Sequence, residues 1–105
     1  TQKGNDQLAI HYLRQAIERS PHDFEYHLTL ANLLSEQGNW QEALTSYESA
    51  AKINPNSTSV YYAMGLIFKN HGNYSEAISN LRAAIRLEPE FTEAICQLMS
   101  VLRIC

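Results

Sequence analysis

Apolar residues recur every three or four positions in six separate segments, and a glycine or a proline lies near the boundary of each segment. This spacing places the apolar side chains on one face of an α-helix. The predicted helices span residues 6–19, 22–37, 40–53, 57–70, 74–87 and 90–104. Residues 1–4 are interpreted as the end of an earlier helix, and Gly4 is expected to turn the chain before residue 6. The pattern therefore predicts an all-α protein.

The turn and packing positions repeat at one fixed spacing of 34 residues. The glycine-asparagine pair of each turn occurs three times, at Gly4-Asn5, Gly38-Asn39 and Gly72-Asn73. A proline ends each repeat, and the three prolines, Pro21, Pro55 and Pro89, follow the same spacing. A period of this length indicates a stack of similar units, each of which buries its apolar face against its neighbours.

Large and small residues also recur in register within each unit. The two complete units read His27-x-x-Leu30-Ala31-x-x-Leu34 with Ala43-x-x-x-Tyr47, and Tyr61-x-x-Met64-Gly65-x-x-Phe68 with Ala77-x-x-x-Leu81. This pattern resembles the tetratricopeptide repeat, whose helices read Trp-x-x-Leu-Gly-x-x-Tyr and Ala-x-x-x-Phe before a proline. The resemblance implies a solenoid of antiparallel helix pairs in a right-handed superhelical stack. It implies a single domain over residues 1–105, with the end of one repeat (1–23), two full repeats (24–57 and 58–91) and a first helix or cap (92–105).

Two residues, Met99 and His27, depart from this pattern. Ala31 and Gly65 are expected where the two helices of a unit cross, because a larger side chain there would overpack the crossing. Met99 takes that place on the last helix, so we expect that no regular partner helix follows it. His27 stands where the family usually has a large aromatic or aliphatic residue, and we interpret it as a partly buried ring.

The charge balance argues against nucleic acid and membrane partners. The chain has 8 Lys and Arg against 11 Asp and Glu, which gives a net charge of -3. It therefore lacks the excess of basic residues that is typical of proteins that bind nucleic acid or anionic membranes. It contains no apolar run of about 18 residues and starts with polar residues, so we expect neither a membrane span nor a signal region. Cys96 and Cys105 fall on opposite faces of one predicted helix and cannot bridge each other there. Reduced thiols favour a cytoplasmic location.

The sequence contains no recognisable motif for catalysis or for binding a cofactor or a metal ion. The four histidines have no metal-ligand spacing, the two cysteines have no zinc spacing, and no glycine-rich phosphate loop is present. We therefore expect neither an enzyme nor a cofactor.

The concave surface of a curved repeat stack is the expected binding face. On the first helix of each unit, a second stripe of residues is offset from the core stripe and is expected to line this groove. The predicted groove residues are Glu25, Leu28, Thr29, Asn32, Tyr62, Leu66, Lys69 and Gln97. The apolar members could contact a partner or pack against a neighbouring unit, and both interpretations remain open.

The groove predicts a protein or peptide partner, held by mixed apolar and side-chain amide contacts. In some family members a clamp of Lys, Asn and Arg grips the carboxylate of chaperone tails. Of the matching positions only Asn32 has a fitting residue type, which argues against that use. The matching positions are Leu28, Thr29, Asn32, Ser59 and Ala63.

Two alternative functions also follow. The end of the chain, from Pro89-Glu90-Phe91 to Leu102-Arg103-Ile104-Cys105, resembles the last repeat before the catalytic domain of O-linked N-acetylglucosamine transferases. This resemblance implies the substrate-selecting region of a larger enzyme. Alternatively, apolar residues at the open ends of the stack, such as Ile95, Leu98 and Leu102, would support self-association.

Overall fold

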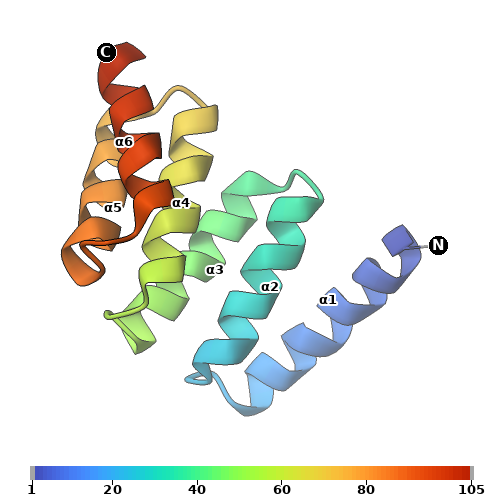
Figure 1. Ribbon diagram of the computed structural model, residues 1–105. Helices are drawn as coiled ribbons and strands as arrows, with labels where there is room; N and C mark the ends of the chain where they lie inside the picture. Colours follow the sequence, from blue (N-terminus) through green and yellow to red (C-terminus); the bar gives the residue numbers. More distant parts are fainter. Residues whose placement is uncertain (1, 105) are drawn as a thin grey trace. The chain divides into compact units, whose positions relative to one another are not determined.

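The computed structural model describes the backbone of residues 2–104 and the side chains of residues 6–103, and this part of the chain is helical without strands (Figure 1). The helices are α1 (Gln2–Arg19), α2 (Phe24–Glu36), α3 (Trp40–Ile53), α4 (Thr58–Asn70), α5 (Tyr74–Leu87) and α6 (Thr92–Ile104). The expected all-α class is confirmed. From α2 onwards each helix begins and ends within two residues of its predicted bounds.

The expected turn at Gly4 is wrong. Helix α1 runs without a break from Gln2 through Gly4 and Asn5 to Arg19. A glycine inside a helix costs only about 1 kcal/mol relative to alanine, and each further residue adds a backbone hydrogen bond once the helix has formed. The recurrence of a glycine at the 34-residue spacing is therefore not sufficient to end a helix.

The described helices form two compact units that divide after Pro55. In the first unit, α2 packs against both α1 and α3. In the second, α5 packs against α4 and α6, and α6 also touches α4. Consecutive helices within each unit run in opposite directions, as Figure 1 shows, so each unit contains the expected antiparallel helix pair.

The turn inside each pair has the same hydrogen-bonded geometry in both units. Gly38 and Gly72 have φ values of 81° and 76°, in the left-handed region that favours glycine. The amides of Asn39 and Asn73 donate to the carbonyl oxygens of Leu34 and Phe68, both at 2.9 Å. These contacts close a Schellman motif, which ends the first helix and directs the chain into the second.

The predicted small and large packing positions are buried together. In the first unit Ala31, Ala43 and Ala50 have no exposed surface, and Tyr47 is 3% exposed. In the second unit the fully buried residues Ala77, Leu81, Ala84, Ala94 and Val101 form one cluster. Small side chains let the helices approach each other, and the large ones fill the space between them.

The last helix buries a face other than the one that carries Ile95, Leu98 and Leu102. It buries Ala94 and Val101, while Met99 and Leu102 are 57% and 54% exposed. Contact with both α4 and α5 turns the stripe of Ala94, Gln97 and Val101 inward, and Ile95 and Leu98 are half-buried. Cys96 is an exposed free thiol, and Cys105 lies outside the described residues.

Candidate functional site

Four of the predicted groove residues lie on α2 in the first unit. Glu25, Thr29 and Asn32 are exposed, and Leu28 is half-buried. Helix α2 is fixed at its start by Asp23, whose Oδ1 accepts hydrogen bonds from the backbone amides of Glu25 and Tyr26. These residues form a mainly polar surface on one side of the helix.

Asn32 has a packing role that the sequence pattern did not indicate. The hydroxyl of Tyr47 on α3 donates a hydrogen bond to Asn32 Oδ1 at 2.5 Å. Burial of the phenol raises the pKa of Tyr47, and the Glu36 carboxylate raises it further, so the hydroxyl stays protonated as a donor. Asn32 therefore links α2 to α3 through its oxygen, and its Nδ2 group keeps hydrogens that can be donated to a partner.

The other four predicted residues lie in the second unit, where two helices bring them together. Tyr62, Leu66 and Lys69 follow one side of α4, and Gln97 lies on α6; all four are half-buried. Lys69 Nζ donates a hydrogen bond to Gln97 Oε1 at 2.6 Å. Residues 28 positions apart in the sequence are thus joined in one surface.

Tyr62 occupies the other end of this surface. Its ring lies against Phe91, with ring centroids 4.8 Å apart and planes tilted by 45°. Partial burial raises the pKa of Tyr62, and the Glu93 carboxylate and Cys96 thiol raise it further. Sequence reasoning missed Phe91 as a site residue: it placed Phe91 in the first turn of a helix over residues 90–104, whereas α6 begins at Thr92 and Phe91 lies in the loop before it.

We define the α4–α6 face as Tyr62, Leu66, Lys69, Glu93 and Gln97. It combines two apolar side chains with an ammonium group, a carboxylate and an amide whose Nε2 atom can still donate. Lys69 and Arg103 lie in the last turns of α4 and α6, whereas Glu93 lies in the first turn of α6. The face is therefore basic at one end and acidic at the other. Tyr62 and Leu66 lie between the charged ends, and the Gln97 amide lies beside Lys69.

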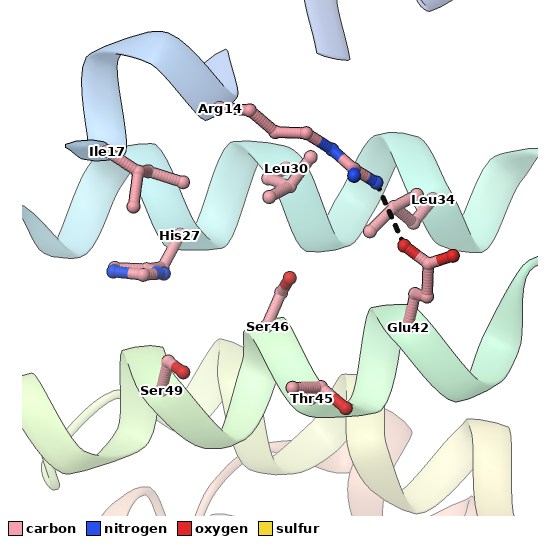
Figure 2. Close-up of a pocket in the computed structure, with 9 residues that line it drawn as sticks. All are labelled: Arg14, Ile17, His27, Leu30, Leu34, Glu42, Thr45, Ser46 and Ser49. Atoms are coloured by element: carbon pink, nitrogen blue, oxygen red, sulfur yellow. Dashed lines mark hydrogen bonds and ion pairs between the residues drawn. The ribbon is translucent and has the colours of Figure 1, made fainter. Parts of the chain in front are cut away.

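A pocket of about 330 Å³, which the sequence did not reveal, lies among α1, α2 and α3 (Figure 2). Its lining is Arg14, Ile17, His27, Leu30, Leu34, Glu42, Thr45, Ser46 and Ser49. Arg14 Nη2 and Glu42 Oε2 form an ion pair at 2.8 Å between α1 and α3. We call this cavity the α1–α3 pocket.

His27 has a structural contact in this pocket. The ring is half-buried, as expected, and its Nε2 atom lies 2.8 Å from the carbonyl oxygen of Pro21. A carbonyl oxygen can only accept, so Nε2 carries the hydrogen, and in the neutral ring Nδ1 is an acceptor. Among the described residues, no three acidic, histidine or cysteine side chains are grouped so that they could hold a metal ion. None of the described helices has the length and apolarity needed to cross a membrane.

Three family profiles match the chain. One described as "TPR repeat" covers residues 31–72, and two described as "Tetratricopeptide repeat" cover residues 12–45 and 58–91. A comparison with curated proteins found no significant match.

Solved structures share the fold. YrrB, described as a TPR protein with an unusual peptide-binding site, is 28% identical with a TM-score of 0.77 over 86% of this chain. MamA is 24% identical with a TM-score of 0.89 over 95% of the chain. The Arabidopsis OM64 TPR domain is 21% identical with a TM-score of 0.85 over 93% of the chain, and the chain covers 81% of it. The chain spans only 46% of YrrB and 58% of MamA.

Proposed function

Because residues 12–91 belong to the tetratricopeptide repeat family, we propose that the chain is a protein-interaction scaffold whose α4–α6 face holds a segment of a partner protein. The peptide-binding site named for YrrB, which is 28% identical, supports this kind of partner. The family is typically a non-catalytic interaction module, in agreement with the absence of a catalytic pattern in the sequence.

The contact between Lys69 and Gln97 is the observation that carries the proposal. It fixes two long polar side chains that would otherwise lose rotamer freedom when a partner binds. Tyr62 is held in the same way by its packing on Phe91. An ordered, half-buried surface of this kind binds a partner at a lower entropic cost than free surface side chains do.

The charges of the face suggest the direction of the bound segment. Lys69 favours an acidic side chain or a chain terminus with a carboxylate, and Glu93 disfavours one at the opposite end. An apolar residue between the two would cover Tyr62 and Leu66. We infer that the preferred ligand is a short extended segment with an apolar centre and one acidic end.

The polar surface of α2 offers a second place for partner contacts in the first unit. Thr29 and the Nδ2 group of Asn32 are exposed there, beside the half-buried Leu28. Substrate selection for a glycosyltransferase, self-association and a cytoplasmic location remain predictions from the sequence.

The direct test of this site is to remove the side chains of Tyr62 and Leu66, which form its apolar centre. Peptides selected on the wild-type chain from a random 12-residue phage library are titrated by calorimetry against Tyr62→Ala/Leu66→Ala. Because these two side chains form the apolar part of the face, the dissociation constant should rise at least about tenfold, which corresponds to 1.4 kcal/mol.

The chain contains a matched control for this variant. Leu8 and Tyr12 are also four residues apart on one helix, and they are 55% and 61% exposed. Leu8→Ala/Tyr12→Ala should leave the affinity of the selected peptides unchanged. Equal affinities for the wild-type chain and Tyr62→Ala/Leu66→Ala would place the peptide site elsewhere.

A further inference from the structure

We propose that the α1–α3 pocket is a second binding site, which takes one aromatic side chain with an N–H or O–H donor, a tryptophan or tyrosine, from a partner protein. The site is separate from the α4–α6 face. At about 100° per residue, His27, Leu30 and Leu34 lie on the side of α2 opposite Leu28 and Asn32. It is therefore also separate from the predicted groove residues of the first unit.

The pocket exists where the first repeat carries smaller side chains than the second. Positions 34 residues after His27 and Leu34 are Tyr61 and Phe68, which pack against the buried cluster of the second unit. An imidazole and an isobutyl group occupy less space than a phenol and a phenyl ring. At these two positions the first unit thus has an imidazole and an isobutyl group where the second has two six-membered aromatic rings, and the resulting space has a size suited to a ring.

The wall of the pocket combines apolar and accepting groups. Leu30 and Leu34 are 7% and 2% exposed and form its apolar side together with Ile17. Figure 2 shows the hydroxyl group of Ser46 pointing into the space between α2 and α3, with Ser49 and His27 together on the Ile17 side of Ser46. The seryl oxygens and, in the neutral ring, His27 Nδ1 can accept a hydrogen bond. An aromatic side chain with one hydrogen-bond donor can pack against the apolar residues and donate to an accepting group. An aliphatic side chain can make only the apolar contacts.

The charges of the lining favour an uncharged occupant. Arg14 is its basic member and Glu42 its acidic member, they pair with each other, and both side chains are 54% exposed. Their charges cancel at the pocket, and the Arg14 guanidinium can stack on an aromatic face. A volume of about 330 Å³ is at the small end of ligand pockets, so it suits a single side chain better than a cofactor.

The test uses N-acetyl-tryptophanamide, N-acetyl-tyrosinamide and N-acetyl-leucinamide as probes on the ¹⁵N-labelled chain. The two aromatic amides should cause saturable shifts at the backbone amides of Ile17, Leu30 and Ser46, with dissociation constants on the order of 1 mM. The leucine amide should bind at least about tenfold more weakly, because it leaves the accepting groups of the pocket unpaired. Absence of saturable shifts, or equal binding of the leucine amide, would overturn the proposal.

The second test fills the pocket with the aromatic side chains that the second repeat carries at the same positions. His27→Tyr/Leu34→Phe introduces the residues of the second repeat and should weaken binding of the tryptophan amide at least about tenfold. Ser49→Phe fills the space from α3 and should act in the same way if the double variant fails to fold. Undiminished binding by a folded filled variant would refute the site. Both variants should retain affinity for library peptides, so failure at the α4–α6 face and failure at this pocket are distinguishable.

Discussion

The substitution Leu81→Ala is expected to lower the free energy of unfolding by about 2–5 kcal/mol. Leu81 has no exposed surface and belongs to the buried cluster contributed by α5 and α6. Truncation removes the transfer free energy of three carbon atoms and leaves a cavity between packed helices. Chemical denaturation followed by circular dichroism measures the loss.

Leu87→Ala is the matched control for this prediction. Leu87 is at the end of the same helix and is 37% exposed, so the same chemical change there creates no enclosed cavity. Its cost should stay below about 1 kcal/mol. Equal losses for the two variants would show that Leu81 is not at the centre of the packing.

Gly65→Leu should destabilise the chain by about 3 kcal/mol, at the upper end of the cost of overpacking. A Cβ atom at Gly65 would lie 2.8 Å from Leu81 Cγ and 3.0 Å from Leu81 Cδ2. Leu81 is fully buried and cannot move aside, so α4 and α5 would have to separate. Thermal unfolding gives the measurement.

Two companion variants identify the cause. Ser59→Leu places the same side chain at an exposed position of α4 and should change stability by less than about 0.5 kcal/mol. Gly65→Ala combined with Leu81→Ala should cost less than the sum of the two single changes, because the shortened Leu81 makes room for the new Cβ. Strict additivity would contradict the assigned contact.

The helices were predictable because their limits depend on local chemistry. Gly38 and Gly72 turn the chain by adopting positive φ, and the residue types that allow this are visible in the sequence. The same signal failed at Gly4, because a glycine permits a turn without requiring one. On α6, spacing identified a helix, but the face that turns inward depends on contact with both α4 and α5, which periodicity cannot reveal.

The sequence could predict which site residues share a surface only where those residues lie on a single helix. Spacing places Tyr62, Leu66 and Lys69 on one side of α4, and these residues do share a surface. The contact of Lys69 with Gln97 depends on the distance between two helices, and the bond from Tyr47 to Asn32 depends on the crossing of α2 and α3. The α1–α3 pocket depends on the sizes of side chains from three helices. No single segment of the sequence shows how these side chains pack together.

The most direct test of the proposed function is a titration of the ¹⁵N-labelled chain with the tightest-binding library peptide, followed by two-dimensional NMR. The α4–α6 face predicts the largest shifts at Tyr62, Leu66, Lys69 and Gln97, including the side-chain amide of Gln97. Saturable shifts elsewhere, with these four residues unmoved, would contradict the assignment of the binding surface.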